Sequence, residues 1–469
     1  MTIVLSVLLL ALLGKFLLPF FLFDVPMGYD AGLYRYLFLS YSEAFPPFVW
    51  PDLAPWAREH PVGLFLFSTI FLKLGLPVDW LIGWIWHVMP VALAGVLAWV
   101  MAQREGKIIG LLVLFAALIS QAYYDGFVLM YWKTELALFF MIFAFHFLER
   151  QSMFFFFFGI LTIITHHQTG LLFGLSVASW WLFQLPRSWR DPVLRRMTVL
   201  LLLIPLIGLL FYIPLWDRAI WSPLYGVLTL RGDAAPGGSF PESIFYLRLM
   251  GILLGFGIAG WIISFRREWG SLWQFAVFWS AVFIIFRLVF YRRFFLQFDF
   301  FLLPFVALAI REACIRWRYP VIRFGCVLFL LVQGFFSIEG MRLRSPMHDA
   351  DTLATIAHIA SVLPDDAFVL AIENRYAPWV RGLFPDHQVG APGLFDFPWT
   401  VEMWRTFVYG NHEERRQLLQ TLDGPVYLID TPFFHEFYGE SADQFLQDPC
   451  FAPTEEARLF RSLCSSLSL

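Results

Sequence analysis

The fold is decided by residues 1–36, MTIVLSVLLLALLGKFLLPFFLFDVPMGYDAGLYRY. The apolar run from residue 2 to residue 23 is long enough to cross a bilayer, which takes about 20 residues. Asp24 and Asp30 follow this run and would lie at the membrane surface. A carboxylate there is costly to desolvate unless it meets water, a metal or a proton donor, so both acids are candidate functional residues. The alternative is a solvated loop in which the acids mark helix boundaries.

The composition of the whole chain agrees with this first run. Of 469 residues, 59% are hydrophobic, 19% aromatic and 15% charged, and the mean hydropathy is +0.67. Repeated apolar runs separated by short charged loops predict a polytopic α-helical membrane protein. The net charge of −3 indicates little, but the lack of a basic tail argues against nucleic acid as a partner. Residues 1–23 lack a basic start and a small-residue cleavage site, so we expect a retained first helix.

The apolar runs and the basic loops together predict a topology. The apolar runs are 2–23, 61–77, 79–101, 108–124, 127–148, 153–165, 169–186, 198–215, 246–265, 272–290, 294–310 and 321–338. If 61–77 does not cross, most of the basic loops lie on one side, which the positive-inside rule makes the cytoplasm. These loops hold Arg104 and Lys107, Arg150, Arg187 to Arg196, Arg266 and Arg267, and Arg311 to Arg323. We therefore expect about 11 spans in a cell (inner) membrane, a cytoplasmic amino terminus and a long first external loop at 24–78.

The composition changes after residue 340. Residues 1–340 form the predicted transmembrane domain, and 341–469 a small extracytoplasmic α/β domain with apolar strands at 367–372 and 425–429 and helices at 401–409 and 413–422. Cys450 and Cys464 could form a disulfide in an oxidising compartment, whereas Cys314 and Cys326 lie near the cytoplasmic side and should stay free.

A polar break interrupts two short apolar runs at residues 165–170, Thr-His-His-Gln-Thr-Gly. Such a break at membrane depth is tolerated only where it lines a cavity or is buried in protein. His166 and His167 are therefore candidates for an aqueous pocket shared with Asp30, and a buried hydrogen-bonded pair is the alternative.

Basic residues gather on the external side, against the positive-inside trend. Arg287, Arg292 and Arg293 lie at one external helix end, and an arginine fork suits the phosphate oxygens of a lipid headgroup. Anchoring to membrane lipids is the alternative. The remaining external polar candidates are Tyr34, His60, Asp125, Lys133 and Arg231.

These residues carry a resemblance to a known family. The external Gly28-Tyr29-Asp30 followed by Tyr34, the runs HPVGL at 60–64 and FLKLG at 71–75, and the acidic second loop at Asp125 resemble the GT-C superfamily of integral-membrane glycosyltransferases. This superfamily includes protein O-mannosyltransferases, lipid A aminoarabinose transferases and oligosaccharyltransferase catalytic subunits.

The resemblance covers residues 1–340 and implies a polyprenyl-phosphate or pyrophosphate sugar as donor and an active site on the external face. It assigns the essential acid to Asp30, with Asp24 second, and the second acidic loop to Asp125. The chain departs from the oligosaccharyltransferase pattern, because no acid follows two residues after Asp125 and the carboxyl-terminal domain lacks Trp-Trp-Asp. Transfer to asparagine is therefore not expected.

The residue types also suit this chemistry on their own. A polyprenyl phosphate is a good leaving group, so one carboxylate that activates an acceptor hydroxyl and cations that hold the phosphate suffice for an inverting transfer. The acids form an incomplete ligand set for an oxygen-binding divalent metal, which favours metal-independent catalysis without excluding a metal. The sequence names neither sugar nor acceptor. A transporter or flippase of lipid-linked sugars, an envelope polymerase or ligase of another fold, and a non-catalytic membrane scaffold are the alternatives.

Overall fold

A computed structural model describes all residues except 46–50, 52, 54–56, 189–190, 214–215, 222–223, 226–239, 289, 317–318, 393–396 and 466–469. The chain divides into two compact units. The first, which we call the helical unit, comprises Met1–Pro19, Arg58–Phe67 and Trp84–Ser345. The second, which we call the sheet unit, comprises Phe20–Ala57, Ser68–Gly83 and Pro346–Leu469. The domain boundary expected at 340 from the sequence stays a prediction.

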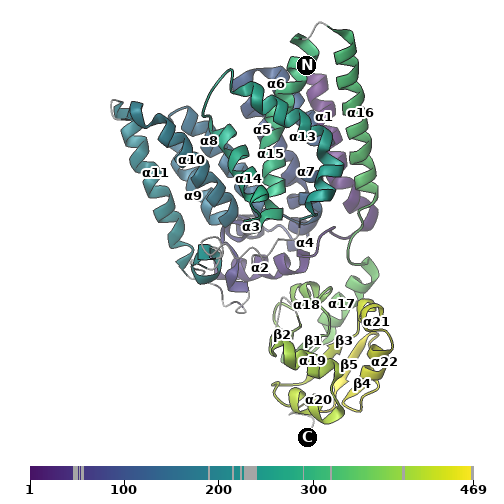
Figure 1. The fold of residues 1–469 in the computed structure, drawn as a ribbon. Helices are drawn as coiled ribbons and strands as arrows, with labels where there is room; N and C mark the ends of the chain where they lie inside the picture. The colour runs from purple at the N-terminus through teal and green to yellow at the C-terminus, as the bar shows by residue number, and fades with distance from the viewer. Residues whose placement is uncertain are drawn as a thin grey trace. The chain divides into compact units, whose positions relative to one another are not determined.

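Apolar helices of different lengths build the helical unit (Figure 1). They are α1 (Thr2–Phe23), α5 (Trp86–Glu105), α6 (Lys107–Ile119), α7 (Gln121–Val128), α8 (Trp132–Glu149), α9 (Phe154–Thr165), α10 (His167–Ser188), α11 (Pro192–Leu210), α13 (Ser243–Ser264), α14 (Leu272–Ile285), α15 (Phe294–Arg311) and α16 (Pro320–Arg342). The chain also has short η elements at η1 (Ala57–Glu59), η2 (Leu81–Ile85), η4 (Trp216–Trp221), η5 (Tyr291–Arg293) and η6 (Glu312–Arg316). Helix α3 (Gly63–Lys73) lies within the first loop as the sequence defined it, and α4 (Val78–Trp80) begins at its end.

Helix α15 forms the centre of the helical unit, where it packs against α6, α13 and α14. In Tyr291–Cys314, 94% of the apolar stretch is buried, compared with 17% in α11 and in α16. Apolar helices that remain this exposed need a lipid surface to cover them. The chain is therefore a multi-pass membrane protein built around a protein-covered central helix.

The number of spans differs from the sequence expectation. Among the described residues, six helices are long and apolar enough to cross a membrane, or seven if the bent pair α6 and α7 is one span. The expected count of about 11 is not confirmed, because segments such as α9 and α14 have only 12 and 14 residues. Helix α3, within the run 61–77, has 11 residues and is also short for a span; that 61–77 does not cross the membrane stays a prediction.

The sheet unit contains the predicted α/β fold. Its strands are β1 (Phe368–Ala371), β2 (Gln388–Gly390), β3 (Val426–Ile429), β4 (Phe451–Pro453) and β5 (Leu459–Ser462), in the order β2-β1-β3-β5-β4. Strands β2, β1 and β3 are parallel, with Val369 opposite Val389 and Tyr427, and β5 pairs antiparallel with β3 and β4. The strands predicted at 367–372 and 425–429 are confirmed as β1 and β3.

Helices surround this sheet (Figure 1). They are α17 (Ala350–Val362), α18 (Ala377–Leu383), α19 (Val401–Tyr409), α20 (His412–Leu419), α21 (Pro432–Tyr438) and α22 (Glu440–Leu446). Trp399, Phe407 and Phe445 belong to its buried core. The sheet unit also includes α2 (Ala31–Ala44), which comes from the first loop.

Candidate functional site

A bend between α6 and α7 sets the direction of the helix that carries Asp125. The two helices meet at 60°, and the bend frees backbone carbonyls of the last turn of α6. Lys15 of α1 donates from Nζ to the carbonyls of Leu118 and Ser120, at 2.7 and 2.8 Å. The Ser120 hydroxyl donates to Asp299 Oδ2 at 2.6 Å and also accepts the N–H of Tyr123 as the cap of α7. Lys15 and Ser120 therefore hold the bend in place.

Asp125 is buried and held by two donors within the helical unit. Arg344 donates from Nε and Nη2 to Asp125 Oδ1, at 3.0 and 2.8 Å, and Gln121 Nε2 donates to the same oxygen at 3.0 Å. Asp125 and Arg344 line a cavity of about 500 Å³, whose wall also includes Glu242 and Arg292. Arg292 is paired with Glu242 at 3.1 Å. The predicted residues Asp125 and Arg292 therefore share one cavity.

The histidine pair lies at a helix break, as the sequence predicted. Helix α9 ends at Thr165, α10 begins at His167, and His166 between them is extended. His166 Nδ1 lies 2.9 Å from Thr169 Oγ1, and Gln297 Nε2 donates to the same hydroxyl at 3.1 Å. The break is thus buried in protein, which is a condition under which irregular backbone is tolerated at membrane depth.

A second polar contact joins the first loop to α8. Lys133 Nζ donates to His60 Nδ1 at 3.0 Å. Burial lowers the pKa of His60 well below its ordinary value, and the charges of Lys133 and Arg293 lower it further. His60 is therefore neutral at pH 7 and acts as a hydrogen-bonding group. Thr134, the residue after Lys133, brings its Oγ1 within 3.4 Å of His166 Nδ1, so this contact lies beside the histidine pair. We call His60, Lys133, His166 and His167 the histidine–lysine group.

Several polar atoms in this region have no partner among the residues that the structure describes. They are His60 Nε2, His167 Nδ1, Arg292 Nε and Arg293 Nε. A buried donor or acceptor without a partner costs about 1–3 kcal/mol. Unsatisfied groups of this kind point to a polar ligand that would satisfy them.

A large apolar cavity adjoins the histidine–lysine group at His167. It has a volume of about 550 Å³ and lies between α9, α10 and α11. His167 and Tyr212 are polar residues in a wall otherwise formed mainly by side chains such as Phe173, Leu201 and Ile204. The cavity therefore suits an apolar chain with a polar group at one end.

The other cations predicted from the sequence are Arg287, Arg293 and Arg231. Arg287 is exposed, in a left-handed conformation after α14. Arg293 lies over the rings of Tyr131 and Phe290, at 5.9 and 5.1 Å. Arg231 lies outside the described residues.

The remaining predicted residues belong to the sheet unit. Asp24 is exposed and left-handed at φ 55°, where its N–H bonds to the Phe20 carbonyl and ends α1. This geometry fits the boundary interpretation. Asp30 is half-buried at the N-terminal cap position of α2, where its side chain makes no capping bond. Tyr34 is buried and stacks on Phe38 at 6.1 Å.

Asp30 is held close to the loop after β1 by its neighbour Tyr29. The Tyr29 hydroxyl donates to the carbonyl of Asn374 at 2.5 Å. Burial raises the pKa of Tyr29, and the carboxylates of Asp30 and Glu373 raise it further, so the hydroxyl stays a donor. The Gly28-Tyr29-Asp30 motif is thus attached to the loop that follows β1 in its own unit.

Helix α2 also packs directly on α18. A Cβ on Gly32 would lie 2.2 Å from the carbonyl oxygen of Pro378, and one on Gly382 would lie 2.3 Å from the carbonyl oxygen of Gly32. Arg35 donates to the Gly382 carbonyl at 2.6 Å, and Arg381 lies 4.1 Å above the ring of Tyr36. Two glycines therefore allow the backbones to meet.

The structure thus brings the predicted residues together in groups. Asp125 and Arg292 line one cavity, and the histidine–lysine group forms another site. Asp30 belongs to the sheet unit. That Asp30 shares a pocket with the others stays a prediction. The sequence reasoning missed Lys15 and Arg344. A single lysine inside an apolar span is a signal that could have identified Lys15, whereas nothing local points from residue 344 to residue 125.

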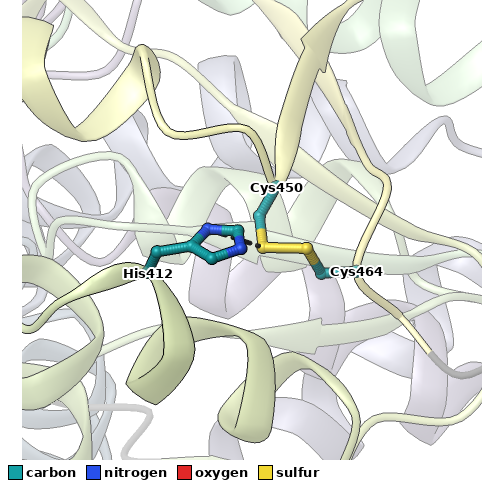
Figure 2. Close-up of side chains that lie close together, drawn as sticks. All are labelled: His412, Cys450 and Cys464. Atoms are coloured by element: carbon teal, nitrogen blue, oxygen red, sulfur yellow. Dashed lines mark hydrogen bonds between the residues drawn. A yellow bond between two sulfur atoms is a disulfide. The ribbon is translucent and has the colours of Figure 1, made fainter.

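One group of three metal-type ligands occurs among the described residues. His412, Cys450 and Cys464 bring their ligand atoms within 4.8 Å of one another. Figure 2 shows that Cys450 and Cys464 are joined in the disulfide considered from the sequence. A metal needs cysteine as the thiolate, so this group does not fit a metal while the bridge is closed. His412 is instead held by Asp448, which is 2.8 Å away.

Comparisons with known proteins give the fold. No protein-family model and no curated protein sequence matches this chain. Among solved structures, the oligosaccharyltransferase of Archaeoglobus fulgidus in its apo form matches with a TM-score of 0.61 and 12% identity, over 94% of this chain and 71% of that chain.

ArnT from Cupriavidus metallidurans matches over nearly its full length. In the apo state the TM-score is 0.60 at 13% identity, and bound to undecaprenyl phosphate it is 0.57 at 12%; both matches cover 98% of this chain and 97% of that chain. Both similar proteins are GT-C membrane glycosyltransferases. The chain therefore has the GT-C fold, and the resemblance inferred from its sequence is confirmed at the level of the fold.

Proposed function

We propose that this protein is a membrane glycosyltransferase that moves a sugar from a polyprenyl-phosphate donor to an acceptor at the external face, with inversion. The observation that carries the proposal is the histidine–lysine group with its unpartnered polar atoms beside the apolar cavity of about 550 Å³. Undecaprenyl phosphate is bound by ArnT, whose fold is similar. A lipid of this class has an apolar prenyl chain, which matches the apolar cavity, and a phosphate, which matches the histidine–lysine group.

Each part of the donor has its own partner in the helical unit. The prenyl chain occupies the cavity between α9, α10 and α11, because burying apolar surface there removes it from water or from looser lipid contacts. The phosphate lies near Lys133 and Arg293, whose donors suit its oxygens and steady the charge that develops as the sugar leaves.

Activation of the acceptor falls to a carboxylate. We assign the general base to Asp30, because it is half-buried and belongs to the Gly28-Tyr29-Asp30 motif on which the resemblance places the essential acid. Asp125 is the weaker candidate, since Arg344 and Gln121 already occupy its Oδ1. Asp24 remains the fallback. We propose that no divalent metal is required, so transfer should persist in EDTA.

The lipid-binding part is tested by filling the cavity. Gly174 lines the cavity, and a Cβ there would meet no atom within 4 Å, so Gly174→Leu should fold and occupy the space of the chain. Gly251 of α13 is also open within 4 Å but does not line the cavity, so Gly251→Leu is the matched control. Intact-mass analysis of purified protein should find a bound prenyl lipid in the control and much less in Gly174→Leu. Equal lipid in both would contradict the assignment.

The catalytic part is tested by sugar transfer from a synthetic polyprenyl-phosphate sugar. Lys133→Met and Asp30→Asn should each lower the rate by about 10²-fold or more. Lys107→Met removes an exposed lysine and is the control. Full activity of Asp30→Asn at normal abundance would refute its role as base. Bound lipid with no transfer by the unaltered protein would instead favour transport of lipid-linked sugars.

A further inference from the structure

The order in which the chain adds strands to the sheet reverses at β1. From β1 the chain continues through α18 to β2 on one side, and then returns through α19 and α20 to pair β3 with the other side of β1. In open parallel sheets, ligands bind outside the carboxyl ends of the strands where the strand order reverses. The loops that follow β1 and β3 are therefore the place to look for a ligand.

A buried carboxylate joins these two loops. Glu373, which follows β1, accepts the N–H groups of Arg375 and Tyr376 and the hydroxyl of Thr431, the last at 3.0 Å. Burial raises the pKa of Glu373, while these hydrogen bonds favour its ionised form. The loops after β1 and β3 are thus held at fixed separation before any ligand arrives.

A cavity of about 230 Å³ lies between these loops and the segment that leads into α17. Its lining combines polar and apolar side chains: Met347, His348, Asp349, Arg375, Phe433 and Glu436. Arg375 lies 4.9 Å above the ring of Phe433, and its Nε donates to the Met347 carbonyl at 2.6 Å. The arginine and the aromatic ring therefore form an ordered wall.

His348 adds a buried hydrogen-bonding group to the cavity lining. It is 4% exposed, and its Nε2 lies 2.6 Å from the Arg375 carbonyl. A carbonyl only accepts, so Nε2 carries the proton and Nδ1 is an acceptor. Burial lowers the pKa of His348 to about 4, so the ring is neutral at pH 7. Nδ1 has no partner among the residues that the structure describes.

The charges in the lining decide between classes of ligand. Arg375 is already paired with Glu436 at 3.5 Å, and Asp349 adds a second carboxylate, so the lining is negative overall. A phosphate or another anion is therefore disfavoured. Donors, acceptors and a ring within one small cavity suit hydroxyl groups, which both donate and accept, on a ring with apolar faces.

We propose that this cavity binds a ring of a neutral saccharide. The binding site consists of Arg375, Glu436, Asp349 and His348 against the ring of Phe433. The saccharide can come from a soluble glycan or from a lipid-linked glycan, which present the same ring. The proposal goes beyond the glycosyltransferase assignment and does not depend on it, because binding needs no donor and no turnover.

Saturation-transfer NMR on the full chain in nanodiscs tests the proposal. The free probes are glucose, galactose, mannose and N-acetylglucosamine, and the lipid arm uses the same sugars on polyprenyl phosphate as competitors. Phe433→Ala removes the ring. Phe437→Ala is the matched control, because Phe437 lies on the same helix, is 67% exposed and does not line the cavity. Glu436→Gln is a mild second variant, since its side chain is 70% exposed.

The expected result is that at least one neutral sugar binds the unaltered protein and Phe437→Ala equally well. Phe433→Ala and Glu436→Gln should weaken this binding by about tenfold or more, the factor that corresponds to about 1.4 kcal/mol. If a lipid-linked sugar displaces the free sugar, the natural ligand is a lipid-linked glycan. If it does not, the natural ligand is a soluble glycan. The proposal is wrong if no neutral sugar binds, if the variants bind as the control does, or if inorganic phosphate displaces the sugar.

Discussion

Replacing Gly32 by alanine should separate α2 from α18 within the sheet unit. The added Cβ would lie 2.2 Å from the Pro378 carbonyl oxygen and 2.4 Å from the Trp379 Cα. Ordinary contacts of this kind lie at 3.4–4 Å, and backbone atoms cannot rotate away as the end of a flexible side chain can. The two helices must therefore move apart by about 1 Å or more.

The size of the effect follows from two opposing contributions. Overpacking costs about 1–3 kcal/mol, and the higher helix propensity of alanine returns at most about 1 kcal/mol. Separation also stretches the hydrogen bond from Arg35 to the Gly382 carbonyl, now 2.6 Å, which is worth about 1 kcal/mol. The net cost to docking is about 1–3 kcal/mol, a 5–150-fold shift in the docking equilibrium.

Hydrogen exchange of the α2 amides measures this shift directly. In Gly32→Ala, the amides of Ala31–Ala44 that exchange by undocking should exchange 5–150-fold faster. Gly14→Ala is the control, because a Cβ at Gly14 meets nothing within 4 Å, and its α2 amides should exchange as in the unaltered protein.

A second variant tests whether one contact is responsible. In Gly382→Ala, the added Cβ clashes with the Gly32 carbonyl, on the other side of the same contact. The loss of stability in the double variant should therefore be smaller than the sum of the losses in the two single variants. Equal α2 exchange in Gly32→Ala and Gly14→Ala would refute the reasoning. Strict additivity would refute the shared contact.

Three further predictions concern other parts of the chain. Lys15→Met leaves two buried carbonyls without their donor and should destabilise the protein by about 1–3 kcal/mol in thermal unfolding, whereas Lys107→Met, at an exposed lysine, should have little effect. Asp125→Asn should destabilise by a similar amount, because the Arg344 charge loses its partner, and adding Arg344→Gln should recover part of the loss. Hydrogen bonds outweigh burial and lower the pKa of Asp448 from 3.8. Its contribution to stability is therefore present above pH 3.8 and is lost as the pH falls further, so acid unfolding of Asp448→Asn should show a shallower dependence on pH in this range.

Local sequence patterns predicted the features that depend on local chemistry. The apolar runs at 367–372 and 425–429 became β1 and β3, because β-branched and aromatic residues there form buried strands. The pair His166–His167 marked a helix end, because polar residues interrupt an otherwise apolar run. These features need only neighbours within a few residues.

The features that escaped prediction depend on distant partners. Lys15 finds its acceptors more than 100 residues away, at Leu118 and Ser120. Arg344 reaches Asp125 across 219 positions. Hydrogen bonds of this separation exist only after the helices have packed, so no spacing rule could have paired these residues.

The contacts of α2 change the role expected for the carboxyl-terminal residues. The sequence treats 341–469 as a separate domain, yet Asn374, Arg381 and Gly382 of this segment bind the loop and helix that follow Asp24. A chain that ended at residue 345 would lose these partners together with the cavity at the end of the sheet. Asp30 would then sit at the start of a helix with one apolar face uncovered, and burial of such a face provides most of the stability of a short helix. The carboxyl-terminal residues therefore hold the proposed base in its observed conformation, which a freely attached binding domain would not do.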